Sequence, residues 1–150
     1  MTFPSHYTLS ADSIYRPNNP VQHRSNEYNE AGFETLLNMQ DIHFWYRGRH
    51  RFLMAAVDRY IAKTETKNDV IDLGGGVGGW IRYLAQHRQD GWGKIALADS
   101  SLDALKLARN ALPPIVQRYQ IDLMQLQMHE QWDAAFLLDV IDTFRTTCKP

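Results

Sequence analysis

The sequence has one cysteine, almost no net charge and no long apolar run, and each shortage excludes a class of protein. Cys148 alone cannot form an internal disulfide framework or a cysteine-based zinc site. With 16 basic and 17 acidic residues the net charge is −1, which leaves no broad basic field for nucleic acid. No run approaches the roughly 20 apolar residues of a membrane span, and Met1–Ser10 lacks the pattern of a signal peptide. We therefore expect a cytoplasmic protein with a small-molecule partner and no nucleic-acid or membrane partner.

Strand-like and helix-like segments alternate along the chain. Its 150 residues, 44% of them hydrophobic, suit one domain with a real core. Apolar runs and helical periodicity predict strands at 70–73, 95–98, 115–119 and 134–138, and helices at 31–40, 52–61, 79–87 and 100–111. This alternation favours an α/β fold, with a mostly parallel sheet flanked by helices.

Three parts are expected along the chain. Residues 1–28 contain several Pro, Asn and Ser and no apolar period, which predicts an irregular N-terminal arm. The helical periodicity within residues 29–66 predicts an N-terminal helical cap. Residues 67–150 contain the expected core strands and form the third part. Ser100, with Asp103 three residues later, has the pattern of a capping box that opens a helix.

Five glycines crowd the six residues 74–79, where the first core strand gives way to a helix. Glycine can adopt positive φ and lets a ligand approach the backbone, and the N–H groups of the next helix favour a negative ligand group. Gly74, Gly76 and Gly79 also satisfy the G-x-G-x-x-G dinucleotide pattern. The loop alone therefore fits more than one nucleotide-containing cofactor.

Two carboxyl groups narrow the choice of ligand. Asp99 ends the next strand, about 20 residues beyond the loop, where an acid can accept both hydroxyls of a ribose; the alternative is a helix N-cap. Asp72, just before the glycines, would repel a dinucleotide's pyrophosphate but could engage the ammonium of an amino-acid ligand such as S-adenosylmethionine. The alternative for Asp72 is a hydrogen bond to the loop's own amides.

Taken together, these segments resemble class I, Rossmann-like S-adenosylmethionine-dependent methyltransferases of the small-molecule type. Residues 70–78 look like the family's first motif, Asp/Glu-x-Gly-x-Gly-x-Gly, and 98–101 like the second, whose acid holds the ribose. Residues 120–123 are similar to the segment whose acid bonds the adenine amino group. Residues 132–141 resemble the fourth motif, and 43–49 resemble a stretch that precedes the core in many members.

The resemblance implies S-adenosyl-L-methionine as cofactor and methyl transfer to an oxygen, nitrogen or carbon of a small molecule. Tyr46 is expected to pack on the methionine portion or the sulfonium of the cofactor, and Arg49 is expected to hold its carboxylate. The alternative is that the aromatic residues of this stretch belong to the core and its arginines form a solvated face. The expected cofactor-binding residues are Tyr46, Arg49, Asp72, Gly74, Gly76, Gly78, Asp99, Ser100, Asp122, Leu123 and Asp139. No catalytic residue is assigned, because the reactive methyl belongs to the cofactor, and the histidines show no metal spacing.

The family sheet has seven strands, whereas this sequence ends after the fourth predicted one. We therefore expect a sheet that is incomplete relative to the family, with 134–138 as an exposed apolar edge prone to pairing with another copy. A fragment, a shortened variant or half of an intermolecular sheet would each have this property. The alternative function is that of a truncated or degenerate methyltransferase, which binds cofactor or a protein partner without turnover.

Overall fold

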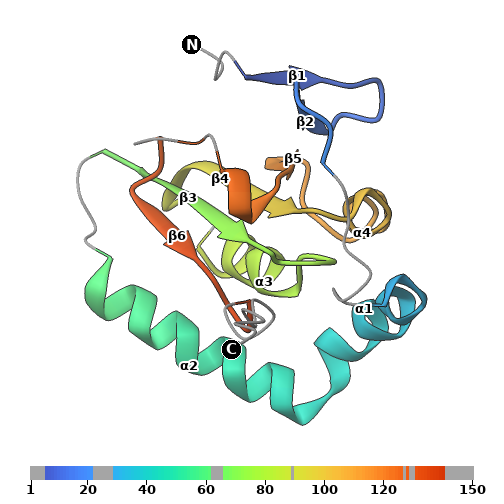
Figure 1. Ribbon diagram of the computed structural model, residues 1–150. Helices are drawn as coiled ribbons and strands as arrows, with labels where there is room; N and C mark the ends of the chain where they lie inside the picture. The colour runs from blue at the N-terminus through green and yellow to red at the C-terminus, as the bar shows by residue number, and fades with distance from the viewer. Residues whose placement is uncertain are drawn as a thin grey trace, which may run out of the picture.

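The computed structural model describes residues 6–21, 29–61, 66–88, 90–126, 128 and 131–140. In chain order its elements are β1 (Tyr7–Leu9), β2 (Tyr15–Pro17), η1 (Glu30–Gly32), α1 (Phe33–Ile42), α2 (Phe44–Tyr60), β3 (Asn68–Leu73), α3 (Gly79–His87), β4 (Trp92–Asp99), α4 (Leu102–Ala108), β5 (Val116–Gln120), η2 (Leu123–Gln125) and β6 (Ala134–Phe136). The strands form one sheet in the order β1-β2-β5-β4-β3-β6. Figure 1 shows this sheet with α2 and α3 on one side of it.

Four adjacent strands, β5, β4, β3 and β6, run parallel to one another, with β6 at the edge of the sheet. Parallel strands need crossovers, which α3 and α4 supply between β3 and β4 and between β4 and β5. This arrangement confirms the predicted α/β fold with a mostly parallel sheet. All four predicted core strands are present, and the helix predicted at 79–87 has these bounds in the structure.

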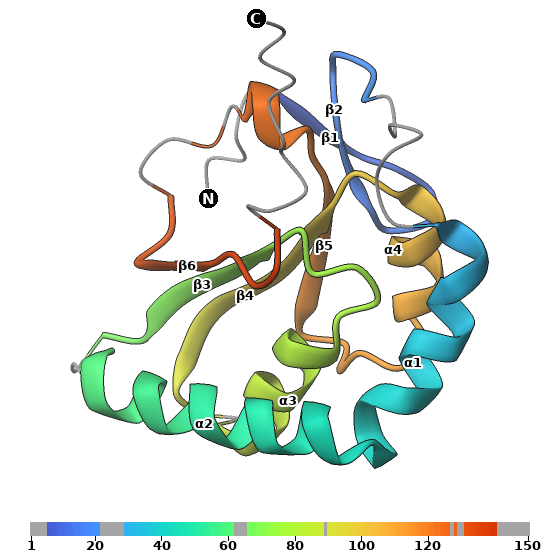
Figure 2. The ribbon, with the colours of Figure 1, turned by 60° about the horizontal axis from the view of Figure 1, so that its bottom comes forward.

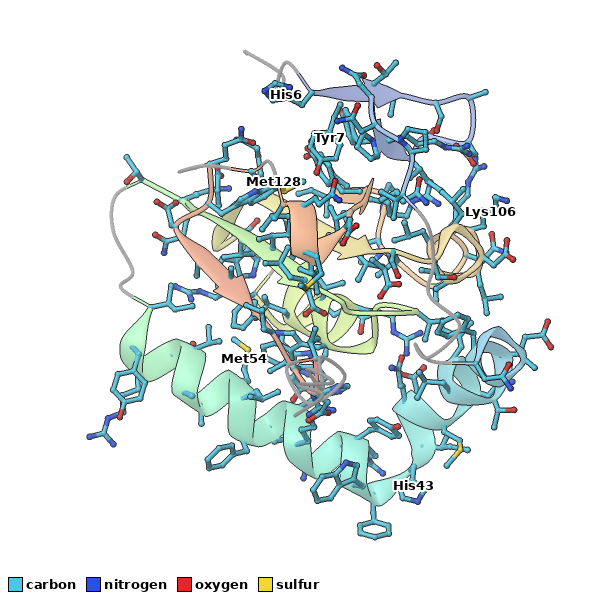
Figure 3. All side chains as sticks on the ribbon, viewed as in Figure 1. His6, Tyr7, His43, Met54, Lys106 and Met128 are labelled. Atoms are coloured by element: carbon cyan, nitrogen blue, oxygen red, sulfur yellow. The ribbon has the colours of Figure 1, made fainter. Side chains whose placement is uncertain are left out.

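The sheet is covered on both faces, which explains why the central strands are apolar throughout. On the helix face, Val70, Ile95 and Leu97 pack with Ile81 and Leu84 of α3. Figure 3 shows Met54 of α2 directed toward the sheet, where it joins this cluster. The opposite face carries a second cluster, built from the alternate residues of the same strands and partly covered by η2 and the segment that follows it. Such two-sided burial is typical of parallel sheets.

The chain reverses its direction across the sheet after β5. From β3 it proceeds outward through β4 to β5, and it then returns to place β6 on the other side of β3 (Figure 2). The carboxyl ends of β3 and β6 therefore flank a topological switch point. Open α/β sheets bind their ligands in the crevice outside the strands at such a point.

The structure has a β-hairpin near the N-terminus, where the sequence predicted an irregular arm. Within residues 6–21, β1 pairs antiparallel with β2, and β2 pairs with β5 through Tyr15 and Tyr119, whose rings stack at 4.6 Å. Three-residue strands are too short to show a period in the sequence. Their position is set by tertiary packing, since Ile14 is fully buried in the core beneath them.

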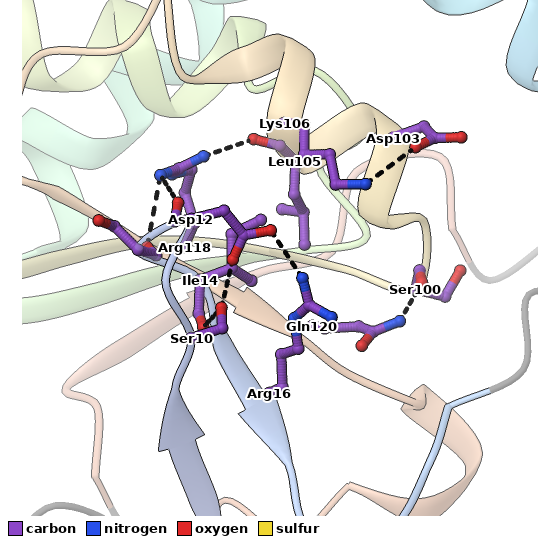
Figure 4. A network of polar contacts seen from close by, with 11 residues as sticks. Ser10, Asp12, Ile14, Arg16, Ser100, Asp103, Leu105, Lys106, Arg118 and Gln120 are labelled. Carbon is purple, nitrogen blue, oxygen red and sulfur yellow. Dashed lines mark hydrogen bonds and ion pairs between the residues drawn. The ribbon is translucent and has the colours of Figure 1, made fainter.

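Arg118 of β5 fastens this hairpin to the rest of the sheet. Its Nη1 donates to the carbonyl of Leu105 in α4 at 2.9 Å, and its Nη2 donates to the carbonyl of Asp12 at 2.9 Å (Figure 4). The Asp12 carboxylate in turn accepts from Arg16 at 2.6 Å. One buried guanidinium thus satisfies backbone carbonyls from two segments that are remote in the sequence.

Two helix starts differ from the prediction. Ser101, not Ser100, caps α4, because its Oγ accepts from the backbone N–H of Ala104 at 3.2 Å. The aromatic stretch expected before a helix is instead the first turn of α2, which begins at Phe44. His43 caps it through Nδ1, which accepts from the N–H of Trp45 at 3.3 Å (labelled in Figure 3). No helix among the described residues is long and apolar enough to cross a bilayer.

Candidate cofactor-binding site

The glycine loop joins β3 to α3 in a conformation that requires glycine. Gly74, Gly76 and Gly78 have φ values of 74°, 56° and 79°, in the left-handed region that side chains with Cβ atoms disfavour. The N–H of Gly74 donates to the carbonyl of Ala98 at 2.7 Å, which ties the loop to the end of β4. A Cβ at Gly76 would meet only Phe33, at 3.9 Å, so the backbone there stays open to a close approach.

Asp99, at the end of β4, holds the loop from the other side. Its Oδ2 accepts from the N–H of Gly76 at 2.8 Å, and its Oδ1 accepts from the N–H of Ser101 at 2.9 Å. The carboxylate thus fixes the loop against the start of α4. An ionised carboxylate is a pure hydrogen-bond acceptor, so this edge of the sheet presents an acceptor beside the open backbone of the loop.

Asp72 is buried directly beneath the loop. Its side chain is only 2% exposed, and its Oδ2 occupies the space that a Cβ on Gly75 would need. Its Oδ1 has no hydrogen-bond donor among the residues that the structure describes. Burial, and then the charge of Asp99, raise the pKa of Asp72 to about 7, while the Arg49 guanidinium acts in the opposite direction. This carboxyl group is therefore poised to ionise when a cation reaches it.

Arg49 and Asp139 form an ion pair that joins α2 to the segment after β6. Arg49 Nη1 lies 2.7 Å from Asp139 Oδ2, and the Arg49 side chain is 21% exposed. Asp139 has a φ of 58°, an uncommon conformation for a residue other than glycine. Arg49, Asp72 and Asp99 share one electrostatic environment, and Asp139 is tied to it through Arg49.

The other predicted site residues are spread more widely. The Tyr46 ring lies against those of His43 and His50, with centroid distances of 6.1 and 6.5 Å. The carbonyl of Ser100 accepts from Gln120 Nε2 at 3.1 Å. The remaining two residues open the turn after β5: Asp122 accepts from the N–H of Met124 at 2.9 Å, and Leu123 packs on the face opposite the helices.

Sequence reasoning missed the apolar contact that closes over the loop. Val140 is 8% exposed, and a Cβ at Gly74 would come within 2.7 Å of its Cγ2. Val140 directly follows Asp139 within the segment that resembles the fourth motif. Its place in that motif was the sequence signal that could have identified the contact. Among the described residues, no group of three His, Cys, Asp or Glu side chains is placed to share a metal ion.

Comparisons with solved structures show which proteins share this fold. A proposed S-adenosyl-L-methionine-dependent methyltransferase from Methanococcus maripaludis superimposes with a TM-score of 0.63 and 15% identity, over 84% of this chain and 57% of its own. Magnesium protoporphyrin IX methyltransferase from Synechocystis PCC 6803, with bound SAH, superimposes with a TM-score of 0.54 and 21% identity, over 75% of this chain and 55% of its own. The SAM-bound amino pentose methyltransferase of Micromonospora echinaspora superimposes with a TM-score of 0.50 and 23% identity, over 77% of this chain and 44% of its own. The chain thus has a Rossmann-like methyltransferase fold and spans about half the length of these proteins.

A family model carries the assignment further than the structures do. No curated protein sequence matches the chain closely enough to count as a relative. The model described as "Methyltransferase domain" matches residues 44–149, which is more than half of the chain and extends from the start of α2 past β6. The match includes the glycine loop, Asp99 and the Arg49–Asp139 pair. The chain belongs to this methyltransferase-domain family.

Proposed function

We propose that the glycine-loop edge of the sheet binds S-adenosyl-L-methionine and that the protein transfers its methyl group to a small molecule. The observation that carries this proposal is the charge around the loop: three carboxyl groups, Asp72, Asp99 and Asp139, and one guanidinium, Arg49. An acidic site favours a ligand that bears an ammonium and a sulfonium, and it disfavours a pyrophosphate.

Two of these carboxyl groups have a part of the cofactor that suits them. The proposed partner of Asp72 is the ammonium, because its buried Oδ1 has no donor in the described structure and its ionised form needs a cation. The proposed partners of Asp99 are the ribose hydroxyls, because its carboxylate ends β4 beside the glycine loop and is a hydrogen-bond acceptor. Gly76 lets the ligand lie against the backbone.

The proposed partner of Arg49 is the cofactor's carboxylate. A guanidinium has five N–H donors, so its contact with Asp139 leaves donors for a second carboxylate. Tyr46 would then contact the methionine portion from the same helix, α2. We further propose that Asp122 and Leu123 flank the adenine beside Ser100, because the N–H of Ile121 donates to the carbonyl of Asp99 at 2.9 Å and brings this turn to the same edge.

The chemistry needs no side chain that forms a bond to the substrate. The bound cofactor supplies an activated methyl group, and the protein aligns an acceptor with it and excludes water. The structural neighbours include an amino pentose methyltransferase and a magnesium protoporphyrin IX methyltransferase, both of which take small-molecule acceptors. A small-molecule acceptor is accordingly our proposal for this chain.

Titration calorimetry with S-adenosylmethionine, its demethylated product SAH and NAD tests the proposed function. We expect the first two to bind at one site and NAD not to bind, because the acidic loop edge repels its pyrophosphate. Binding of NAD alone would contradict the assignment. Cofactor binding without methyl transfer to any acceptor would favour a module that binds without turnover.

We also propose that β6 mediates self-association. It pairs only with β3 in the described part of the sheet, and Leu137 just beyond it is 43% exposed. Unpaired strand edges template pairing with a second chain. Light scattering after size-exclusion chromatography should therefore show a mass that rises above the monomer with concentration, and Ala135→Lys should suppress the rise. A monomer at every concentration would contradict the proposal.

A further inference from the structure

We propose that a second pocket, outside the glycine-loop edge, binds a phosphate-bearing small molecule. It lies where α1, α2 and α3 meet, at the corner between α1 and α2 seen in Figure 2, and has a volume of about 280 Å³. This is just below the roughly 300–1,000 Å³ found for small-molecule pockets, which suits a small ligand. Its lining includes Arg47, Arg51, Arg82, Asp41, His50 and Gln40.

The fixed charges of this pocket are mostly positive. Among the described residues, three arginines line it against one acid, Asp41, which is paired with Arg82 at 2.5 Å. Arg47 and Arg51 have no acidic partner among the described residues, and they stand four residues apart on the exposed side of α2. Like charges at this spacing destabilise a helix. A bound anion would remove that cost, so a pair of arginines with no acid beside it in the described structure predicts an anionic ligand.

Buried polar groups form the inner wall. Arg82 is only 8% exposed, and its guanidinium is held in place by Asp41. Gln40 is 8% exposed, its amide packs against Gly79, and its Oε1 has no hydrogen-bond partner in the part of the chain that the structure describes. The pocket therefore has a buried polar wall and an exposed cationic rim, an arrangement that suits a small polar ligand.

His50, a buried residue of the lining, adds no positive charge to the pocket. Burial, followed by the charges of Arg49 and Arg82, lowers the pKa of His50 to about 4; His87 adds to this effect, and Asp41 opposes it. The imidazole is thus neutral at physiological pH. The positive charge available to a ligand comes from the arginines.

Phosphate is the anion that this donor set fits best. The planar guanidinium presents a fork of N–H donors that matches phosphate oxygens two at a time, and Arg47 and Arg51 can approach from one helix while Arg82 approaches from another. Gly79, the residue next to the glycine loop, also lines the pocket. A ligand there would therefore contact the start of α3, although the inference does not depend on what the loop itself binds.

Titration with inorganic phosphate and pyrophosphate at constant ionic strength tests the inference. We expect saturable binding, stronger for pyrophosphate, and a loss of at least tenfold in affinity in Arg47→Gln/Arg51→Gln. Arg59→Gln is the matched control: Arg59 lies on the same helix but over the Tyr60 ring, outside the pocket, and its loss should leave binding unchanged. Equal binding by all three proteins, or no saturation at millimolar phosphate, would overturn the inference.

A second readout locates the anion. In a histidine NMR titration, bound pyrophosphate should raise the apparent pKa of His50 because a negative charge in the pocket favours the protonated imidazole. An unchanged His50 pKa at saturating pyrophosphate would place the anion elsewhere and overturn the assignment to this pocket. Tighter binding of a carboxylate such as citrate would overturn the phosphate class.

Discussion

Asp72→Asn is expected to make the protein more stable above pH 7 and to weaken its binding of S-adenosylmethionine. The wild-type carboxyl group is fully buried without a hydrogen-bond donor on Oδ1 in the described structure. Its ionised form is therefore costly in the absence of a ligand. Asparagine has nearly the same shape and never acquires that charge.

The sign of the pH dependence follows from the raised pKa. The unfolded chain releases the Asp72 proton near the ordinary aspartate pKa of 3.8, whereas the folded chain keeps it until about pH 7. Unfolding between these values releases a proton, so the free energy of unfolding contributed by Asp72 falls as pH rises from about 4 to 7 and is constant above. The stability advantage of Asp72→Asn over the wild type should grow by about 2 kcal/mol between pH 5.5 and 8.5, at 1.36 kcal/mol per pH unit.

Urea unfolding of both proteins at the two pH values measures this difference. Asp103→Asn is the control, because Asp103 is an exposed carboxyl group in an ion pair with Lys106 on α4. The control should show no such growth in stability. An Asp72→Asn advantage that does not change with pH would show that Asp72 is already ionised in the folded protein.

The affinity for the cofactor should change in the opposite direction. At pH 8 the ionised Asp72 pairs with the ammonium, and its loss should weaken binding by about 10- to 100-fold, which corresponds to a charged hydrogen bond of roughly 1.5–3 kcal/mol. At pH 5.5 the wild type must first release its proton, so the two affinities should converge. Equal affinities at pH 8 would contradict the proposed ammonium contact.

Asp99→Ala is expected to lower cofactor affinity at every pH. The change removes the acceptor proposed for the ribose hydroxyls and also the bonds from the N–H groups of Gly76 and Ser101. Calorimetry with SAH should show a loss of about 10- to 100-fold for a charged hydrogen bond, and more if the loop rearranges.

A second variant separates these two causes. Asp99→Asn keeps one side-chain oxygen that can accept from Gly76, but it reduces the acceptors available to the ribose. Its loop should resemble that of the wild type in amide hydrogen exchange, and yet its affinity should still fall. An Asp99→Asn protein with wild-type affinity would assign Asp99 to the loop alone.

The sequence was sufficient for the parts of the fold that follow local rules. Buried parallel strands are continuous apolar runs, so the run at Val70–Leu73 and its three counterparts were recognisable. The glycine cluster was recognisable because positive φ at Gly74, Gly76 and Gly78 leaves few alternatives. Asp72 and Asp99 could be placed at one edge because they end adjacent parallel strands.

Other features depend on contacts that no local pattern contains. The hairpin of β1 and β2 exists because Tyr15 stacks on Tyr119, over 100 residues away in the chain. The pocket of arginines arises where α1 turns into α2 beside α3, which requires the packing of three helices. The choice of Ser101 over its neighbour as the helix cap depends on where Asp99 ends β4.

A crystal structure of the protein with SAH tests the central claim most directly. The account predicts that the ribose hydroxyls lie within hydrogen-bond distance of Asp99 and that the amino group lies within hydrogen-bond distance of Asp72 Oδ1. It also predicts that the carboxylate contacts Arg49, on the α2 side of the loop. SAH bound away from the glycine loop, or with its amino group directed away from Asp72, would contradict the account.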